Sequence, residues 1–513
     1  MDTYECHVKI MKKNQKKKNS ILNKYSKFAE VLFLLSCIAF VIVLAILGIL
    51  PLSYLLILIG GLSVFTMLFG IIAFVKGVNG FNKVIQSIIC TLLSVVLIIG
   101  SIGIEFYKDK IKNIFTNTES VTLYVYALKD SPIEVADDLG GTSMGLSTFT
   151  NPTVQETAFS DLIGYLSKYE LGDVSTTTYS GINKIVDALY NREVNTIMIQ
   201  SNLVDVIKEI PDYSDFESKV KVVYESTHQV TIKGSDANFK IKNITKDPFI
   251  VAVGGQDYNG NFDVNMVATV NPLTKQVLIV TVPRDAYSPL NGDPEKMDKL
   301  SYSGQLGSDV WFNTLQLIFD YKFNFYAVVD YYSISDVIDA VDGIDIYNPY
   351  YFTTVGGNGR SPRGYDYSFP EGELHLNGDR TLSYVRERYN LPTYDLGRNE
   401  HQGIVLKALI KKLTSSEIVS HADSVLEVLE SKVASDFTPE IIYKLVSMQL
   451  ADNADWNIVT YNIKGEVFYT YSYMIGHEYG PNYAMMDLYE DTVIKANKLM
   501  KQVLDGDIIK SNN

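Results

Sequence analysis

Three long uncharged stretches near the N-terminus are the clearest pattern along the chain. Residues 31–50, 52–75 and 84–104 contain no Asp, Glu, Lys or Arg. A helix of about 20 apolar residues spans the hydrocarbon core of a bilayer, and buried helices of soluble proteins rarely run this long without a charge. The apolar region of a cleaved signal peptide is only about 7–15 residues long. The pattern therefore predicts three transmembrane helices within residues 28–107.

Lysine placement predicts how these helices are oriented. The segment 12–18 (KKNQKKK) precedes the first stretch, and Lys76 and Lys83 lie between the second and the third. Cytoplasmic loops carry an excess of Lys and Arg. Residues 1–27 are therefore expected to form a basic cytoplasmic tail. The chain is expected to be a multi-pass protein of the cell membrane, with its large C-terminal part extracytoplasmic.

Beyond the apolar stretches, short runs of strand and helix character alternate. Residues 105–118 are polar and are expected to form a stalk. Residues 118–240 are then expected to form an α/β accessory domain. Its predicted strands are 121–128, 196–200 and 219–225, its predicted helix is 181–194, and 140–153, rich in Gly, Ser and Thr, is predicted to be a loop. No catalytic constellation is apparent in this region.

Residues 241–507 show a second alternation of this kind, which predicts an α/β domain with a central sheet covered by helices. Ser335 is a candidate N-cap and Gly343 a candidate C-cap of one of its helices. The predicted strands are 248–253, 263–270 and 276–282, and the predicted helices are 309–321, 335–343 and 399–413. The fold class is therefore α/β, with three N-terminal membrane helices and two domains.

Composition narrows the range of functions. The 513 residues carry a formal net charge of −14, whereas nucleic-acid binding needs a basic face. Cys6, Cys37 and Cys90 all precede residue 100, so the outer part has no disulfide framework. A large outer part without cysteine fits the outer surface of a Gram-positive bacterium. The chain has no phosphate-binding loop motif, no nucleophile-elbow motif and no zinc spacing of histidines.

The arginines carry the functional signal. The chain has 37 lysines but only eight arginines, and six of these fall within residues 360–398. The guanidinium fork binds phosphate oxygens bidentately and keeps its charge when desolvated. Surface ion pairs are a sufficient explanation for Arg360, Arg363 and Arg380.

The other arginines are expected to converge. Arg386 and Arg388 share one face if TLSYVRERY is a strand, and Tyr384 then points the same way while Val385 and Glu387 point to the other side. Asp395 precedes a predicted helix start.

Two further segments belong to this prediction. Arg398 and Gln402 are four residues apart and so lie on one helix face. Arg284 directly follows an apolar strand. Together these segments predict one pocket for a phosphate or pyrophosphate. Asp257 and Asp263 are candidate ligands of Mg²⁺, which binds one or two carboxylates together with substrate phosphates.

At this point the sequence resembles a known family. The motifs VPRDAY (282–287), DKLSYSG (298–304), DAVDGIDI (339–346), LNGDRTLSYVRERY (376–389) and DLGRNEHQ (395–402) occur in the order found in the LytR-CpsA-Psr (LCP) family. The membrane-first layout is similar to that of its CpsA-like branch of capsule and cell-wall polymer ligases. The resemblance covers residues 241–507 closely and the remainder more loosely.

The resemblance implies a phosphotransferase. Such enzymes move a glycopolymer, such as capsule polysaccharide or teichoic acid, from a polyprenyl-pyrophosphate carrier to peptidoglycan. Carried over by position, the pyrophosphate would be held by Arg284, Arg386, Arg388 and Arg398. Lys299 and Gln402 would assist, Asp257 and Asp263 would bind Mg²⁺ or Mn²⁺, and Asp395 would orient an arginine or take a proton. The expected partners are the lipid-linked polymer, peptidoglycan and the membrane, with no nucleic acid.

The sequence departs from the family pattern at two places. Asn261-Phe262-Asp263 stands where Arg-Ser-Asp is frequent, and His401 stands where Arg is frequent. Helices 309–321 and 335–343 are candidates for lining a prenyl groove, although ordinary core packing explains them equally well. Two other functions remain open: a sensor that binds the lipid-linked polymer without turnover, and a Mg²⁺-dependent polyprenyl-pyrophosphate phosphatase.

Overall fold

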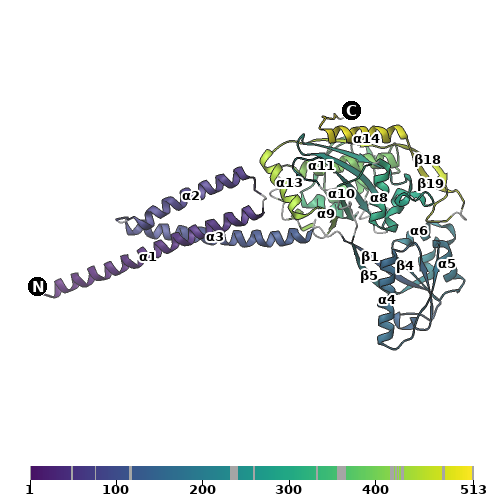
Figure 1. Ribbon diagram of the computed structural model, residues 1–513, viewed down its shortest axis with the longest axis horizontal. Helices are drawn as coiled ribbons and strands as arrows, with labels where there is room; N and C mark the ends of the chain where they lie inside the picture. The colour runs from purple at the N-terminus through teal and green to yellow at the C-terminus, as the bar shows by residue number, and fades with distance from the viewer. Residues whose placement is uncertain are drawn as a thin grey trace. The chain divides into compact units, whose positions relative to one another are not determined.

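A computed structural model describes residues 2–510 except 48–49, 76, 115–117, 232–240, 258–259, 320, 331–332, 355–365, 416–420, 422–423, 426, 429–431 and 477–479. Contacts within it divide the chain into two compact units (Figure 1). The first comprises residues 1–113 and 438–454, and the second comprises residues 114–437 and 455–513. Each unit is described by itself.

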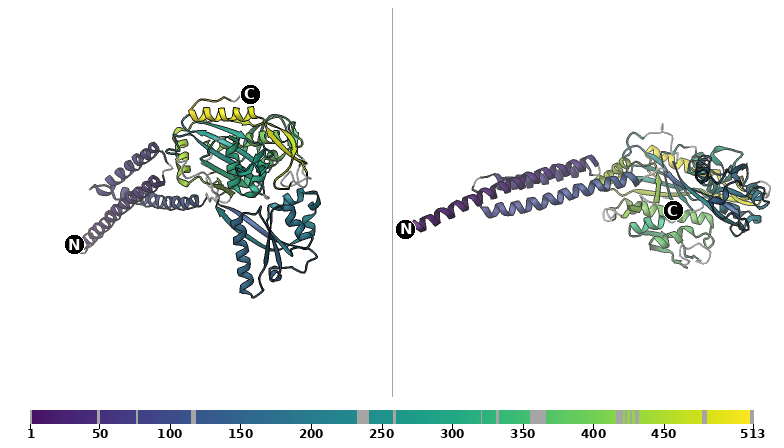
Figure 2. Two further views of the ribbon diagram at one scale, coloured as in Figure 1. Left: turned by 45° about the vertical axis from the view of Figure 1, so that its right-hand side comes forward. Right: turned by 90° about the horizontal axis from the view of Figure 1, so that it is seen from below.

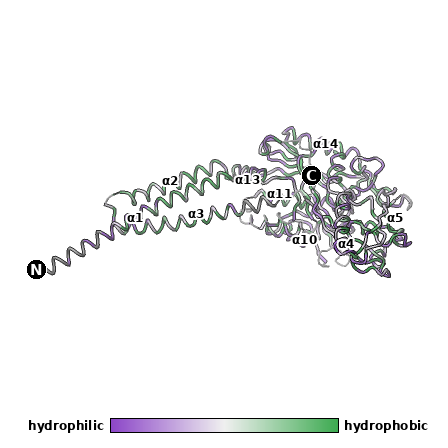
Figure 3. Tube along the Cα trace, turned by 60° about the horizontal axis from the view of Figure 1, so that its bottom comes forward, coloured by the Kyte–Doolittle hydropathy of each residue, from purple (hydrophilic) through white to green (hydrophobic). Residues whose placement is uncertain are grey.

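The first unit contains three helices that are long and apolar enough to cross a membrane. They are α1 (Asp2–Leu47), α2 (Leu52–Phe74) and α3 (Gly80–Ile114), and their candidate spans are 17–46, 52–74 and 80–106. Figure 3 shows apolar colouring along much of these helices, whereas the start of α1 is hydrophilic. Because α3 continues without a break to Ile114, residues 105–114 of the predicted stalk are the end of a helix, and their role as a stalk stays a prediction.

Polar contacts join α1 to α3. Ser26 Oγ donates a hydrogen bond to Gln86 Oε1 at 2.7 Å, and Lys83 Nζ donates to Asn23 Oδ1 at 2.7 Å. Polar side chains within spans face other helices, because lipid offers them no partner. The helix α13 (Pro439–Asp452), whose Thr438 side chain caps its N-terminus, groups with this unit.

The second unit begins with a five-stranded sheet in the order β3-β2-β4-β1-β5. Its strands are β1 (Thr118–Leu128), β2 (Ser143–Ser147), β3 (Ser175–Tyr179), β4 (Thr196–Gln200) and β5 (Val220–Thr231). The helices α4 (Pro152–Lys168), α5 (Ile182–Tyr190), α6 (Leu203–Glu209) and α7 (Phe216–Lys219) pack on it. Every residue of β4 is buried, as expected for a central strand covered on both faces.

The predicted loop at 140–153 is wrong over half of its length. Residues 143–147 form β2, which pairs in parallel with β3 and β4. Gly145 allows this, because a Cβ there would come within 3.2–3.3 Å of Ile185, Ile197 and Tyr179. Gly145 therefore reflects tight packing of an interior strand, whereas Gly140 and Gly141 lie in a turn.

A six-stranded sheet in the order β16-β11-β6-β7-β8-β17 forms the second domain of this unit. Its strands are β6 (Phe249–Gln256), β7 (Phe262–Asn271), β8 (Gln276–Thr281), β11 (Phe325–Asp330), β16 (Val433–Ser435) and β17 (Asn457–Asn462). β6, β7 and β8 are antiparallel neighbours, whereas β11 runs parallel to β6 and β17 runs parallel to β8.

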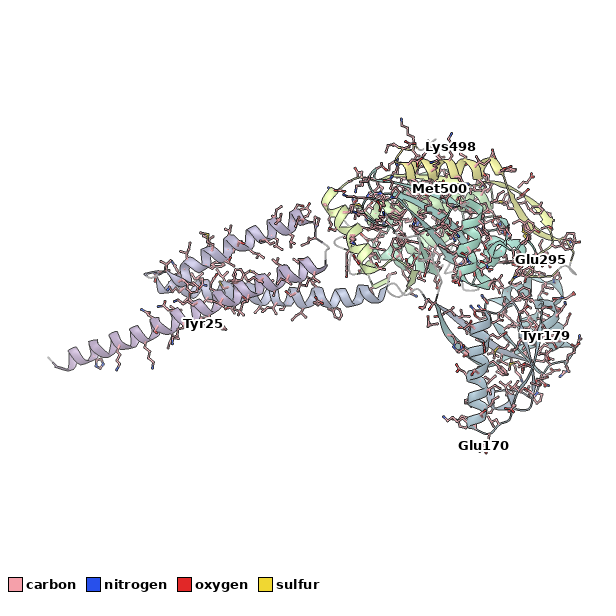
Figure 4. All side chains as sticks on the ribbon, viewed as in Figure 1. Tyr25, Glu170, Tyr179, Glu295, Lys498 and Met500 are labelled. Atoms are coloured by element: carbon pink, nitrogen blue, oxygen red, sulfur yellow. The ribbon has the colours of Figure 1, made fainter. Side chains whose placement is uncertain are left out.

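Helices cover both faces of this sheet. α8 (Ser308–Phe319) and α14 (Glu490–Asp505) bury one face, in a core that includes Trp311 and Met500. Figures 1 and 2 show α14, in yellow, lying across this side, and in Figure 4 Met500 lies beneath the helix while Lys498 is exposed. α9 (Ser333–Ala340), α10 (Gly378–Arg386) and α11 (Asp395–Leu413) form a second core on the other side.

Short antiparallel pairs complete the second unit. These are β9 (Tyr287–Pro289) with β10 (Met297–Lys299), β12 (Ile344–Asn348) with β15 (Gly372–Leu376), β13 (Phe352–Thr353) with β14 (Ser368–Phe369), and β18 (Gly465–Thr470) with β19 (Tyr483–Leu488). Short 3₁₀ segments are η1 (Ala136–Leu139), η2 (Pro211–Tyr213), η3 (Leu290–Gly292) and η4 (Leu300–Leu306).

The α/β fold class with three N-terminal apolar helices is confirmed, while one predicted helix cap differs from expectation. The helix expected from Ser335 starts at Ser333, so Ser335 lies inside the helix and does not cap it. Gly343 does close the turn after α9: its φ is +78°, and its N–H donates to Ile338 O at 2.9 Å. The predicted helices 309–321 and 335–343 contribute Trp311 and Ile338 to the cores at 0% exposure, so these side chains do not line a groove.

Candidate active site

Asp263 occupies a β-bulge at the start of β7. Gly255 pairs with Val264 and Gln256 pairs with Phe262, so Asp263 is the extra residue between them. A bulge turns a side chain away from the regular alternation. Phe262 stacks on Trp311 with ring centroids 4.1 Å apart. The bulge leaves Asp263 Oδ1 in contact with Arg284 Nη1 at 2.6 Å.

Arg284 lies just after β8 and is held by two carboxylates. Its Nε lies 3.7 Å from Asp285 Oδ1, and Lys299 Nζ lies 3.7 Å from the same oxygen. The nearby Asp263 carboxylate is the main reason that the pKa of Arg284 is raised above its usual value. Burial opposes ionisation of Asp285, but the charges of Arg284, Lys299 and Arg398 outweigh it and lower the pKa of this carboxyl.

The segment TLSYVRERY is not the strand that its pattern predicted. Residues 378–386 form α10, and Arg386 is its last residue. Tyr384 does not share the arginines' face: it is 0% exposed, and its hydroxyl donates to Asn348 Oδ1 at 3.0 Å in the core. The helix is capped by Asn377, whose side chain accepts from Arg380 N.

Glu387 shapes the turn that presents Arg388. The backbone becomes extended at Glu387, and Oε1 of this buried side chain accepts hydrogen bonds from the N–H groups of Arg388 and Asn390, both at 3.0 Å. The segment containing Pro392 then leads into α11, which begins at Asp395.

Asp395 joins two arginines. Its Oδ2 lies 2.8 Å from Arg388 Nε, and its Oδ1 lies 2.8 Å from Arg398 Nη2. Because each oxygen already contacts a guanidinium, the geometry supports the orienting role expected for Asp395 more than proton transfer.

The arginine segments converge on Asp263. Burial opposes ionisation of this carboxyl, but the charges of Arg284, Arg398 and Arg386 outweigh it and lower its pKa. From α11, Gln402 Nε2 also reaches the Asp263 backbone carbonyl at 3.4 Å. The structure thus brings Arg284, Arg386, Arg388, Asp395, Arg398, Lys299, Gln402 and Asp263 into one cluster.

This cluster has the charge and the free donors that an anion needs. Four arginines and Lys299 provide five positive charges against the four carboxylates of Asp263, Asp285, Asp395 and Glu387. Arg398 is only 6% exposed, and its buried Nε makes no hydrogen bond to any residue that the structure describes; the same holds for Nε of Arg284. Buried donors of this kind are normally satisfied by a partner, and a pyrophosphate offers matching oxygens.

Asp257 stands slightly apart from the arginines, in the turn between β6 and β7. Its Oδ1 accepts from Asn261 N at 2.8 Å and its Oδ2 accepts from Asn261 Nδ2 at 3.2 Å. Among the described residues there is no group of three or more His, Cys, Asp or Glu side chains that fits a metal ion. Mg²⁺ usually binds one or two carboxylates and completes its shell with waters and substrate phosphates, so its binding by Asp257 and Asp263 stays a prediction. Asp263 is kept ionised, as a metal ligand must be.

The remaining arginines lie elsewhere. Arg380 rests over the ring of Phe369, with 4.9 Å to the centroid, and donates to Ser368 O. Arg192 pairs with exposed Asp130. Arg360 and Arg363 lie outside the described residues.

Sequence reasoning missed two acids of this site. Asp285 directly follows Arg284 in VPRDAY, and Glu387 lies between Arg386 and Arg388. The signal was present in both cases, since a carboxylate next to a clustered arginine is a natural partner. Glu387 was instead assigned to the opposite side of a strand.

The two departures from the family pattern are accommodated outside the arginine cluster. His401 is 0% exposed and stacks on Tyr384, with ring centroids 4.0 Å apart. Burial lowers the pKa of His401 to about 4, so this ring is neutral at pH 7. Asn261 binds Asp257 and accepts a hydrogen bond from Gln305 at 2.8 Å.

Fold and site together define an α/β protein with apolar N-terminal helices and a buried arginine cluster suited to a phosphate-containing anion. The model of the LytR_cpsA_psr family matches residues 197–485. The chain belongs to this family.

Several known proteins are similar to it. The polyisoprenyl-teichoic acid–peptidoglycan teichoic acid transferases TagU of Enterococcus faecalis and Bacillus subtilis are each 28% identical to it, over 229 and 227 residues. Each match covers 43% of this chain and 71% of the relative. Among solved structures, B. subtilis TagV matches with a TM-score of 0.41 and 25% identity, over 51% of this chain and 98% of TagV.

Proposed function

We propose that this protein transfers a glycopolymer from a polyprenyl-pyrophosphate carrier to peptidoglycan. The observation that carries the proposal is the cluster of Arg284, Arg386, Arg388 and Arg398, which with Lys299 provides five positive charges against four carboxylates. Family membership supports the same reaction, as do the names of the TagU relatives.

The chemistry follows from what such a cluster stabilises. An acceptor hydroxyl oxygen forms a bond to the phosphorus that carries the polymer. The bond from that phosphorus to the bridging oxygen breaks, and the prenyl phosphate departs with the electron pair. The hydroxyl proton ends on the departing phosphate. Negative charge shifts onto the bridging and equatorial oxygens, where fixed guanidinium groups stabilise it without rearranging.

Each residue has a distinct part in this scheme. Arg388 and Arg398, fixed by Asp395, bind phosphate oxygens. Arg284, which follows β8 and is fixed by Asp263 and Asp285, binds a further phosphate oxygen. Lys299 assists on the side of Arg284, and Gln402 assists on the side of Arg398. Asp257 and Asp263 would hold Mg²⁺ or Mn²⁺, which supplies charge neutralisation to the pyrophosphate when bound.

The apolar helices place this reaction at a membrane in our proposal. Anchoring the chain by α1–α3 holds the site near the bilayer that contains the prenyl carrier, which raises the effective concentration of the carrier. The lysine pattern supports a cytoplasmic N-terminus and an extracytoplasmic site, as on a Gram-positive cell. Capsule polysaccharide and teichoic acid are both suitable polymers.

The proposal is tested with the full-length chain in nanodiscs and a prenyl-pyrophosphate-linked saccharide, with and without a peptidoglycan acceptor. We expect turnover that requires the acceptor. Turnover into water without acceptor would instead indicate a phosphatase, and tight binding without turnover would indicate a sensor.

Metal dependence is a separate prediction from the same assay. Removal of divalent ions with EDTA should lower turnover, and added Mg²⁺ or Mn²⁺ should restore it. The Asp263→Asn variant should need more metal than the wild type to reach half of its maximal rate. Full activity in EDTA would contradict the metal site.

A further inference from the structure

A polar cavity lies at the junction of the two domains of the second unit. It has a volume of about 380 Å³, within the range of about 300–1,000 Å³ typical of small-molecule sites. One wall is β1 of the accessory sheet, with Ser120 and Thr122. The opposite wall is the turn between β6 and β7, with Asp257 and Gly260, together with Gly304 of η4.

The two walls are fixed to each other. Tyr302 of η4, together with Met474 and Ile475, packs into the core of the accessory domain. The Tyr302 hydroxyl donates a hydrogen bond to Glu209, at the end of α6. The cavity is therefore a built feature of one compact unit.

The lining is suited to a neutral, hydroxyl-rich ligand. It presents the amides of Asn151, Asn202 and Gln256 and the carboxylates of Asp257 and Asp330. Amides and hydroxyls both donate and accept hydrogen bonds, and carboxylates accept them. The charged side chains among the described lining residues are Asp257, Asp330 and Lys432, with no arginine, whereas a pyrophosphate is matched by the arginines of the cluster. Sugar hydroxyl and acetamido groups match this set of donors and acceptors.

Asn202 gives the second observation. It is only 8% exposed, yet its Oδ1 has no hydrogen-bond partner among the described residues. Its side chain does not cap α6, although it precedes that helix. Gly260 leaves room for the amide, because a Cβ there would meet Asn202 Nδ2 at 2.6 Å. A buried acceptor without a partner calls for a donor from a ligand.

The cavity and the arginine cluster share one hairpin. Asp257 lines the cavity, Asn261 bonds to it, and Asp263 enters the arginine cluster two residues further on. A saccharide bound in the cavity would present a hydroxyl beside a pyrophosphate held by the arginines. This arrangement favours the acceptor over the donor polymer, because the acceptor oxygen must approach the phosphorus from outside the carrier.

We propose that this cavity binds the acceptor: an N-acetylated, hydroxyl-rich glycan strand of peptidoglycan. This inference rests on the proposed function and assigns the accessory domain a part in acceptor binding. The accessory strand β1 and Asn202 then determine acceptor affinity, while the arginines determine donor affinity.

The test measures binding and turnover separately. The probe is a peptide-free tetrasaccharide of alternating N-acetylglucosamine and N-acetylmuramic acid, titrated into the full-length chain by calorimetry. Ser120→Trp fills the cavity from an exposed strand position, and Asn202→Ala removes the unpaired amide. Thr176→Trp, on the exposed edge strand β3, is the matched control.

We expect the wild type and Thr176→Trp to bind the tetrasaccharide equally. Ser120→Trp should abolish this binding, and Asn202→Ala should weaken it about tenfold. In the transfer assay, Asn202→Ala should raise KM for the acceptor with little change in kcat or in donor affinity.

Other results distinguish failure of the cavity inference from failure of the proposed function. Unchanged glycan binding in Ser120→Trp and Asn202→Ala would overturn the inference, as would absence of binding in the wild type. Loss of donor affinity instead of acceptor affinity would also overturn it, since the cavity would then hold the donor's sugar. Glycan binding that depends on the cavity, in a chain without transferase turnover, would support the site while rejecting the proposed function.

Discussion

At the scale of single residues, the site consists of arginines held in place by carboxylates. Asp395 contacts both Arg388 and Arg398 at 2.8 Å, and Asp263 contacts Arg284 at 2.6 Å. These contacts fix the guanidinium planes before any ligand binds, and preorganised charge is the main source of electrostatic catalysis.

Arg398→Lys tests whether the planar fork matters as well as the charge. Lysine keeps the positive charge but cannot bind Asp395 and a phosphate oxygen with the same fixed geometry. We expect kcat/KM to fall by about 10²-fold, the order found when one oxyanion donor is lost. Arg192→Lys, at an exposed pair with Asp130, is the control and should keep full activity. If Arg398→Lys were as active as the wild type, Arg398 would contribute only its charge.

Asp298 provides a pH prediction. Burial raises its pKa from 3.8 to about 6, although Ser472, Met474 N and Lys299 N donate to it. Because the folded state holds this proton more tightly than the unfolded state, the group stabilises the fold most at low pH. That contribution is lost as pH rises from about 4 to about 6.

Melting temperatures of the full-length chain in detergent measure this effect. The wild-type value minus that of Asp298→Asn should decrease between pH 4 and pH 6 and then stay level. Asparagine at position 298 also places its own N–H donors next to those that Asp298 accepts from, but this destabilisation does not depend on pH. A constant difference over this range would contradict the raised pKa.

The sequence predicted the identity of the site residues better than the secondary structure that carries them. The scarcity of arginine drew attention to Arg284, Arg386, Arg388 and Arg398, which the structure brings together. The strand predicted around Arg386 was wrong because tertiary packing of Leu382 and Tyr384 supports a helix over 378–386. Local pattern cannot weigh such contacts.

At the scale of elements, the hairpin of β6 and β7 organises the site. Its turn carries Asp257 and its bulge carries Asp263, and η4 packs against it through small residues. A Cβ on Gly304 would lie 2.3 Å from Gly260 O and 2.4 Å from Phe262. A bulge cannot be located from one sequence, because it depends on the register of the partner strand.

Gly304→Ala should therefore destabilise the protein by about 1–3 kcal/mol, as overpacking does. The matched control is Gly164→Ala in α4, where the new Cβ meets nothing within 4 Å. Alanine there should stabilise the exposed helix by up to about 1 kcal/mol. Chemical denaturation of both variants measures the change in the free energy of unfolding. An unchanged value for Gly304→Ala would show that the hairpin shifts to accept the new Cβ at little cost.

At the scale of the whole molecule, the chain combines apolar helices with an α/β unit that carries the site. The spans were readable from sequence because lipid imposes a length and a composition on a helix. The junction of accessory and catalytic domains was not readable, because it depends on contacts such as Tyr302 with Glu209 between distant segments.

The central claim is that the arginine cluster holds a lipid-borne pyrophosphate. The most direct measurement is calorimetric binding of a short-chain prenyl pyrophosphate to the full-length wild type, Arg386→Ala and Arg388→Ala, with melting temperatures recorded in parallel. The account predicts loss of affinity of about 10²-fold or more in each variant with the fold retained. Unchanged affinity in both folded variants would contradict it.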